Sequence, residues 1–341
     1  MRLIIIRFLN AQVIMNTISL SVLLLVLIVG CNQGPDINKI LTVPPYASIT
    51  DSIKRFPDRP ELYLTRALRL SQNNLHDIAT PDYKKTWELT NDEAIAQEYA
   101  NNLLLANKVN EAVKFLEERR KQFPSNNEIG RRLSEAYISA GKSKEAMAEY
   151  DKMLAVDSTN FMVWFEKGRL LAQLRDTAGA VVALEKSYSI QPLNYSGLEL
   201  MQIYSDLNNP RVLVMCDDII QKDSAADILD ARLYKGIYYS VNGQYAEALK
   251  WIDQCINKEW KFDQAHIEKG IVFFRQKDYT KALESFKVAA TVKNTNGDAY
   301  FWAARCYEAL NNKEQAIENY ETALAFDPTI DEAREALKRL K

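Results

Sequence analysis

The chain has 341 residues, of which 47 % are hydrophobic and 26 % are charged, and its formal net charge is −2. Proteins that bind nucleic acid usually concentrate Lys and Arg into a strongly basic domain, so a charge this close to neutral argues against a nucleic-acid partner. The apolar content is ample for a folded, soluble body behind the N-terminal segment.

The first thirty residues have the composition of a secretion signal. Arg2 and Arg7 precede an uncharged, largely apolar run over residues 18–29, which ends at Gly30 directly before Cys31. A basic start, an apolar centre and a small residue at the end are typical of a cleaved signal peptide. The ending resembles the bacterial lipobox, and the resemblance implies that residues 1–30 are removed and that Cys31 is acylated.

An uncleaved anchor is the alternative for this segment, since residues 13–29 approach the ~20 apolar residues that span a bilayer. Gly30 before the cysteine favours cleavage. Residues 31–50 are polar and rich in turn formers, and we interpret them as a tether between the lipid and the folded body. Asn32 follows the cysteine where, in enteric bacteria, Asp tends to retain lipoproteins in the inner membrane. This resemblance favours a lipid-anchored location in the outer membrane of a bacterial envelope rather than the inner one.

From Glu93 onwards the sequence repeats with a strict period of 34 residues. Position 8 and position 20 of each repeat are small, with one exception each, while positions 11 and 24 are mostly large and often aromatic. Apolar spacings of three and four residues predict two amphipathic helices in each repeat, with Gly or Asn between them in most repeats. Proline at position 32 ends the second helix in three repeats, so each unit is expected to be a helical hairpin.

These positions resemble the tetratricopeptide repeat. The resemblance implies an all-α, right-handed superhelical solenoid of about eight hairpins over residues 51–341, closed by a capping helix at 331–341. The first copy, at about 60–92, is looser and one residue shorter than the others. The remaining repeats are expected at residues 93–126, 127–160, 161–194, 195–228, 229–262, 263–296 and 297–330.

The repeat at 195–228 keeps the length of the others but departs from their packing pattern. Gln202, Ser205, Val214 and Asp218 stand where small, large, small and large residues are expected, and Pro210 lies near the turn. Two interpretations remain open, a drifted repeat that still folds as a hairpin and a bend or hinge between two blocks.

No catalytic or metal-binding pattern is present in the sequence. His76 and His266 have no second His or Cys at ligand spacing, and no phosphate-binding loop, nucleophile elbow or zinc-protease motif occurs. Cys216, Cys255 and Cys306 form no CxxC pair, and Cys255 is expected to be a buried packing residue. We therefore expect no enzyme activity and no cofactor.

The resemblance also implies a candidate peptide-binding groove, because the first helix of each hairpin lines the concave face of such folds. The corresponding candidates are Arg131, Phe165, Arg169, Leu233, Ile237, Ile267, Ile271, Phe274 and Phe301. Apolar side chains at one end of the groove would hold anchors of a peptide, and the arginines would bind its carboxylates. The alternative is that the apolar side chains pack between neighbouring hairpins and never reach solvent.

The sequence thus favours a scaffold that binds protein or peptide partners at a bacterial cell envelope and reaches the membrane through its N-terminal lipid. The alternative is a structural subunit of a larger envelope assembly that leaves the concave groove empty. The Lys and Asn pairs by which some co-chaperones of this family clamp a C-terminal carboxylate are absent at positions 5 and 9.

Overall fold

The computed structural model describes residues 37–192, 194–223, 225 and 227–341. All regular secondary structure in these residues is helical, which confirms the all-α prediction. The described residues belong to two compact units, which we call the N-terminal unit (37–191) and the C-terminal unit (192–341). The predicted signal peptide and Cys31 lie outside the described residues.

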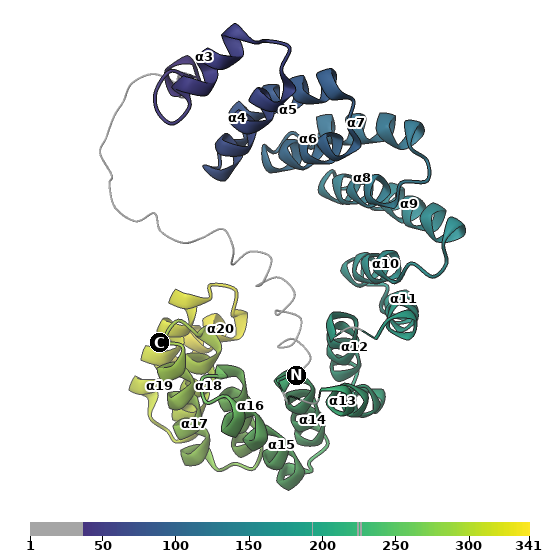
Figure 1. The fold of residues 1–341 in the computed structure, drawn as a ribbon. Helices are drawn as coiled ribbons and strands as arrows, with labels where there is room; N and C mark the ends of the chain where they lie inside the picture. The colour runs from purple at the N-terminus through teal and green to yellow at the C-terminus, as the bar shows by residue number, and fades with distance from the viewer. Residues whose placement is uncertain (1–36, 193, 224, 226) are drawn as a thin grey trace. The chain divides into compact units, whose positions relative to one another are not determined.

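The N-terminal unit consists of two short helices followed by four helical hairpins (Figure 1). The short helices are α2 (Ile37–Leu41) and α3 (Ala47–Arg55). The hairpins are α4 (Pro60–Gln72) with α5 (His76–Thr90), α6 (Glu93–Leu105) with α7 (Val109–Gln122), α8 (Asn127–Ser139) with α9 (Ser143–Val156), and α10 (Phe161–Gln173) with α11 (Thr177–Ile190).

The C-terminal unit consists of four hairpins and a final single helix. The hairpins are α12 (Asn194–Asp206) with α13 (Arg211–Lys222), α14 (Leu229–Val241) with α15 (Tyr245–Lys258), α16 (Asp263–Arg275) with α17 (Tyr279–Val292), and α18 (Gly297–Ala309) with α19 (Lys313–Phe326). The final helix is α20 (Asp331–Leu340).

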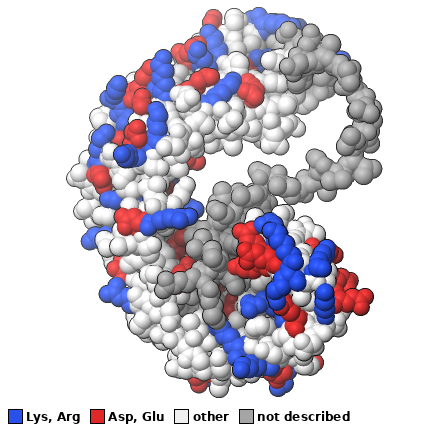
Figure 2. Space-filling view, turned by 180° about the vertical axis from the view of Figure 1, so that it is seen from behind, with Lys and Arg blue, Asp and Glu red and all other residues white. Residues whose placement is uncertain are grey.

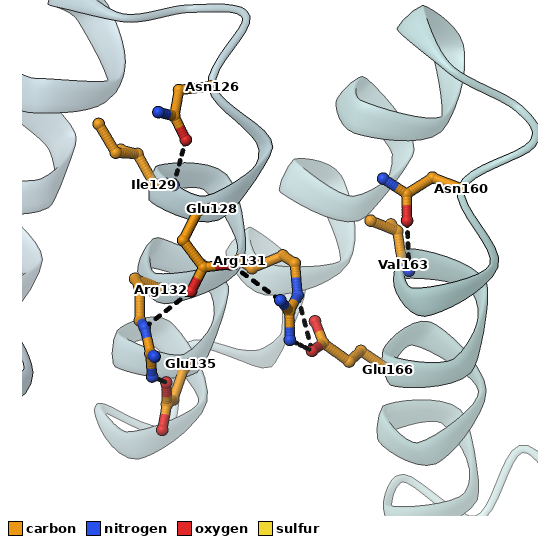
Figure 3. Close-up of polar contacts among 9 residues, drawn as sticks. All are labelled: Asn126, Glu128, Ile129, Arg131, Arg132, Glu135, Asn160, Val163 and Glu166. Carbon is orange, nitrogen blue, oxygen red and sulfur yellow. Dashed lines mark hydrogen bonds and ion pairs between the residues drawn. The ribbon is translucent and has the colours of Figure 1, made fainter. Parts of the chain in front are cut away.

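The helices begin and turn where the local sequence satisfies the backbone. The side chains of Asn126 and Asn160 accept hydrogen bonds from the N–H groups of Ile129 and Val163, which caps α8 and α10 (Figure 3). The turn of the α8–α9 hairpin places Gly141 at φ 72°, a left-handed conformation that glycine adopts without steric cost. Capping and turn residues therefore set the hairpin boundaries.

Small residues allow the two helices of a hairpin to pack closely. Gly270 of α16 faces Phe286 of α17, and a Cβ placed on Gly270 would lie 2.5 Å from the Phe286 ring. Gly168 and Leu184 form the same contact in the α10–α11 hairpin. This pairing of small with large side chains fills the space between helices at the density of a protein core.

The repeat that departs from the pattern still forms a hairpin, since α12 and α13 are both helical. Pro210 precedes the first residue of α13, where its missing N–H costs no helical hydrogen bond. Cys216 of α13 is buried against Met201 of α12. The boundary between the two units falls at residues 191 and 192, directly before this hairpin. A bend at this repeat stays a prediction.

The tether predicted for residues 31–50 is wrong for residues 37–50, because α2 and the first turn of α3 lie there. Ile49 and Ile53 of α3 are buried, and Thr50 accepts a hydrogen bond of 3.0 Å from Arg66 of α4. The apolar face of α4 would otherwise meet water, so an additional helix covers it. The sequence did not lead us to predict this helix, because its nine residues carry only a short apolar face.

The polar helix α20 covers the other end of the hairpin series. Ala333 and Ala336 are buried against the last hairpin, while Glu332 and Glu335 face solvent. Among the helices of the described residues, none is both long and apolar enough to cross a lipid bilayer.

Candidate functional site

The first helices of successive hairpins lie side by side in the C-terminal unit, where α12 contacts α14, α14 contacts α16, and α16 contacts α18. We call the surface that these helices form the first-helix face. Arg275 of α16 donates a hydrogen bond of 2.6 Å to Ser240 of α14 across this surface. The face is therefore continuous enough to contact an extended partner segment.

Four of the apolar groove candidates are buried between helices. The exposed fractions are 4 % for Leu233, 2 % for Ile267, 7 % for Ile271 and 5 % for Phe301. The other three apolar candidates, Phe165, Ile237 and Phe274, are half-buried. These values favour the packing alternative, because neighbouring first helices approach closely enough to cover side chains that a helical wheel would assign to a groove.

In the N-terminal unit, Arg131 is already engaged by carboxylates of the protein itself (Figure 3). Its Nε donates to Glu166 over 2.9 Å, and its Nη1 donates to Glu128 over 2.9 Å. The bond with Glu166 raises the pKa of the Arg131 guanidinium. Arg131 thus joins α8 to α10 rather than offering donors to a ligand. Arg169 is exposed, with its Cζ 5.7 Å from the centre of the Phe165 ring.

A group of carboxylates surrounds Tyr234 on the first-helix face of the C-terminal unit. Asp206 of α12, Asp230 of α14 and Glu268 of α16 all contribute to the raised pKa of Tyr234, whose largest cause is burial. Tyr234 donates a hydrogen bond to Gln202 of α12. Tyr234 therefore joins α14 to α12, and charges on three successive first helices act on it.

None of these three carboxylates forms an ion pair in the described residues, although the charge of Arg275 acts on Glu268 and lowers its pKa. Desolvation by neighbouring atoms raises the pKa of Asp206 to about 6 and that of Glu268 to about 7, and it raises the pKa of Asp230 as well. The side chains of Asp206 and Asp230 are nevertheless exposed, whereas Glu268 is half-buried, so desolvation is strongest at Glu268. Amide donors compensate in part, because Gln202 donates to Asp206 and Gln264 donates to Glu268, each over 3.1 Å.

The groove predicted from the sequence did not include these carboxylates, because its candidates stand almost entirely at positions 5 and 9 of the repeats. Asp206 stands at position 12 of its repeat and Asp230 at position 2 of the next, and both positions also point inwards in the family. Reading these two columns would have found the negative charge. Glu268 stands at position 6, which no simple rule would have selected.

Arg305 of α18 lies on the same face among aromatic rings. Its Cζ is 4.5 Å from the ring centre of Trp302, 4.9 Å from that of Phe274 and 5.8 Å from that of Phe301. Phe274 and Trp302 contact each other edge to face, with ring centres 5.4 Å apart. The arginine side chain is therefore held in place by side chains from α16 and α18. We call Arg305 and these three rings the arginine–aromatic cluster.

A shallow pocket of about 280 Å³ opens between α4, α5 and α6 of the N-terminal unit. Leu68, His76, Asn101 and Leu105 are among its lining residues. Beneath it, buried Asn102 donates hydrogen bonds to the His76 carbonyl and to the Thr80 hydroxyl. Asn102 is thus bonded within the protein, whereas the buried Nδ1 of His76 has no hydrogen-bond partner in the described residues.

The described residues contain no group of His, Cys, Asp or Glu side chains that could hold a metal ion. His266 is buried and its Nε2 lies 2.9 Å from the Trp260 carbonyl, in keeping with a packing role. The three cysteines of the solenoid are free and buried, and burial raises the pKa of each thiol to about 12. On the described surface seen in Figure 2, Lys and Arg are interspersed with Asp and Glu.

The fold and this face define a class of helical-repeat proteins built from stacked hairpins. A tetratricopeptide-repeat family model matches residues 273–341. The solved structure of PilW, a widely conserved type IV pilus biogenesis factor, shares the fold, with a TM-score of 0.51 and 20 % identity, over 61 % of this chain and 97 % of that one. The chain thus has the fold of tetratricopeptide-repeat proteins, as the sequence predicted, and its residues 273–341 match the model of that family.

Two curated relatives carry the same repeat. A TPR repeat-containing protein of Methanocaldococcus jannaschii is 24 % identical over 214 residues, which is 58 % of this chain. The Hsp70-Hsp90 organizing protein of Triticum aestivum is 31 % identical over 109 residues, which is 30 % of this chain. The matched segments span 37 % and 19 % of the lengths of these relatives. Proteins of this family act as scaffolds for protein–protein interactions.

Proposed function

We propose that this protein is a lipid-anchored scaffold of a bacterial cell envelope that holds a partner protein on the first-helix face of its C-terminal unit. The family supports the binding of proteins. The signal-like segment before Cys31 supports export and acylation, and Asn32 supports the outer membrane as the location. No enzyme activity is part of this proposal.

The observation that carries the proposal is the group of unpaired carboxylates around Tyr234. A desolvated carboxylate without a countercharge favours its neutral form, which is why the pKa values of Asp206 and Glu268 are raised. A Lys or Arg side chain of a partner would supply the missing charge and favour ionisation. Binding of a basic segment therefore strengthens as the pH rises from about 5 to about 8.

The first experiment replaces all three carboxylates with neutral amides. The variant Asp206→Asn, Asp230→Asn, Glu268→Gln removes the negative charge with little change in shape, and its helicity should match that of the parent by circular dichroism. We expect it to lose a partner that the parent retains when both are purified from native membranes and compared by mass spectrometry. The retained partner is then measured against both proteins by calorimetry at several pH values.

A matched control removes three exposed carboxylates elsewhere in the C-terminal unit, through Glu314→Gln, Glu318→Gln and Glu332→Gln. It changes the net charge by the same amount and should keep the partner. Equal partner recovery by the parent and the variant at Asp206, Asp230 and Glu268 would contradict the proposed binding face.

The anchor is tested separately by labelling cells with a radioactive fatty acid. The parent should incorporate label and fractionate with the outer membrane, whereas Cys31→Ala should remain unlabelled. Equal labelling of the two proteins would end the lipoprotein hypothesis without affecting the proposed binding face.

The second candidate function is a structural subunit of a larger envelope assembly that binds through other surfaces. The burial of Leu233, Ile267 and Phe301 favours it, because these side chains are not available as apolar anchors on the first-helix face. This function predicts that the carboxylate variant assembles normally, so the same experiment separates the two.

A further inference from the structure

The arginine–aromatic cluster places a positive charge on the first-helix face without using its hydrogen-bond donors. Ring centres of Trp302 and Phe274 lie 4.5 Å and 4.9 Å from the Cζ of Arg305. Aromatic rings attract a guanidinium through their electron-rich faces. The donors of a guanidinium, in contrast, lie in its own plane and point outwards from its edge.

The donors of Arg305 have no acceptor in the described part of the protein. No hydrogen bond or ion pair of Arg305 occurs there, and the residue is half-buried. Glu308, one turn further along α18, forms its hydrogen bonds with other residues. It accepts hydrogen bonds from Arg339 of α20 and, over 3.1 Å, from Tyr320 of α19. Arg305 is therefore a cation held by the rings whose donors have no acceptor in the described residues, while the charge of Glu308 acts on it without a hydrogen bond.

We propose that Arg305 binds an acidic side chain within the partner segment that lies on the first-helix face. A carboxylate can accept two parallel hydrogen bonds from a guanidinium, a pairing that is both strong and directional. The three rings hold the guanidinium in place before binding, which lowers the entropic cost of forming this pair. The inference rests on the proposed function and names the chemistry of the partner.

The position of Arg305 favours the side-chain carboxylate of an acidic residue inside the partner segment over the carboxylate at the C-terminus of a partner. Arg305 is the ninth of the 13 residues of α18, so it lies within the face and not at an end of the helix. A segment that crosses α18, α16 and α14 continues on both sides of it. Half-buried Phe274 beside the arginine offers a contact for an apolar residue next to the acidic one.

Together with the carboxylates around Tyr234, this cluster gives the face a pattern of charges. Arg305 extends from α18 over Phe274 of α16, whereas Asp206, Asp230 and Glu268 belong to α12, α14 and α16. A partner segment that fits this pattern has an acidic residue and an apolar neighbour where it crosses α18. It has a basic residue where it crosses α12, α14 or α16. Charge order of this kind determines the direction in which a segment binds.

The test selects short peptides from a random display library on the full chain without its signal peptide, and on the Arg305→Met variant. We expect the parent to enrich peptides with Asp or Glu at one fixed position beside an apolar residue, and the variant to lose this preference. One enriched peptide is then synthesised with its acidic residue and with the matching amide. The amide should bind the parent about ten- to a hundredfold more weakly, and the two should bind Arg305→Met equally.

Two further variants separate recognition from folding. Arg305→Lys keeps the charge but loses the planar pair of donors, so it should retain only part of the preference. Arg334→Met removes an exposed arginine of α20 that is bonded to Asp331 and the Pro328 carbonyl, and it should leave the selection unchanged. Thermal unfolding followed by circular dichroism checks that each variant is folded.

The outcomes distinguish this inference from the proposed function. An enriched consensus without an acidic position, or the same acidic preference in the parent and in Arg305→Met, overturns the role of Arg305 and leaves the proposed function standing. No enrichment by the parent at all overturns both.

Discussion

Arg66 and Asp82 are two charged residues buried between α4 and α5. Two hydrogen bonds of 2.7 Å connect the guanidinium to both oxygens of the carboxylate, and the side chains are only 10 % and 5 % exposed. A third donor reaches Thr50 of α3. The pair therefore ties the additional N-terminal helix to the first hairpin.

Removing one partner of this pair should destabilise the N-terminal unit. We expect Asp82→Asn to lower the free energy of unfolding by about 3–5 kcal/mol, because the arginine stays buried without its countercharge. The double variant Arg66→Met, Asp82→Leu should recover much of this loss, since it buries no charge. Urea titration followed by circular dichroism measures both, and an equal loss in the two variants would contradict this explanation.

Glu268 makes stability depend on pH in a direction opposite to that of an ordinary ion-paired carboxylate. Desolvation raises its pKa in the folded state to about 7, above its ordinary value of 4.5, while Arg275 and Gln264 act against this rise. Between these values the folded state binds more protons than the unfolded state. Stability should therefore fall as the pH rises from 4.5 to about 7 and show no further change from this group above that.

The variant Glu268→Gln should remove this part of the pH dependence and be more stable than the parent at neutral pH. Urea midpoints measured at several pH values test the prediction. Asp206 contributes in the same direction with a pKa of about 6, so a smaller slope remains in the variant. An unchanged pH profile would show that Glu268 is ionised in the folded protein as in water.

The contact between Gly270 and Phe286 shows that the two helices of a hairpin need side chains of complementary size at positions 8 and 24. Position 8 is Gly or Ala in most repeats, and the side chain at position 24 fills the space above it. Where α16 has glycine, the Phe286 ring occupies the volume that a methyl group would need. Where α18 has Ala304, Tyr320 stands at position 24 and both are buried. Each hairpin thus has its own pair of complementary volumes.

The variant Gly270→Ala should therefore destabilise the C-terminal unit, although alanine favours a helix. Overpacking typically costs about 1–3 kcal/mol, which exceeds the gain of about 1 kcal/mol from helix propensity. The same substitution should cost less in a Phe286→Leu background, where the smaller side chain leaves room. A double-mutant cycle by urea unfolding measures this coupling, and strictly additive effects would refute the proposed contact.

At the scale of the whole molecule, the boundary between the units coincides with the start of the repeat that departs from the pattern. Each unit has its own buried core, in keeping with a solenoid in which hairpins contact only their neighbours. We expect residues 37–191 and 192–341 to fold when expressed separately, with helical spectra that sum to that of the full chain. A random-coil spectrum for either fragment would show that the units depend on each other.

The hypothesis of a bend at residues 195–228, one of the two interpretations of this repeat, has a separate test. Amide protons of α12 and α13 should exchange faster than those of α16 and α17, because their packing pattern is the least regular of the series. Hydrogen exchange followed by mass spectrometry measures this directly. Uniform protection through residues 195–228 would rule the bend out.

The sequence predicted the hairpins well because their signals are local and repeated. The small residues at position 20, such as Ala112, and the large residues at position 24, such as Leu116, contact residues of the same hairpin. The capping asparagines and the turn glycines also act within a few residues. These signals can therefore be recognised without knowing how distant parts of the chain pack. The helix α3 escaped prediction because it occurs once and has no repeat to support it. Its role is to cover α4, and that depends on tertiary contact.

The candidate site was much harder to predict from the sequence. A helical periodicity assigns Leu233 and Ile267 to the same face as Arg305, but it does not say how closely the next helix approaches. The structure buries the first two and leaves the arginine half-buried. Similarly, the sequence predicted Arg131 as a ligand-binding residue, but its Nε donates a hydrogen bond to Glu166, which lies 35 residues later in the chain.

The sequence by itself determined the helical repeat, its hairpins and its polar final helix, because those depend on backbone preferences and apolar spacing within one repeat. Only the tertiary structure decided which charges of the first-helix face are paired within the described part of the protein and which are not. Ion pairing and burial depend on distances between helices that are far apart in the chain, and a period in the sequence does not contain those distances.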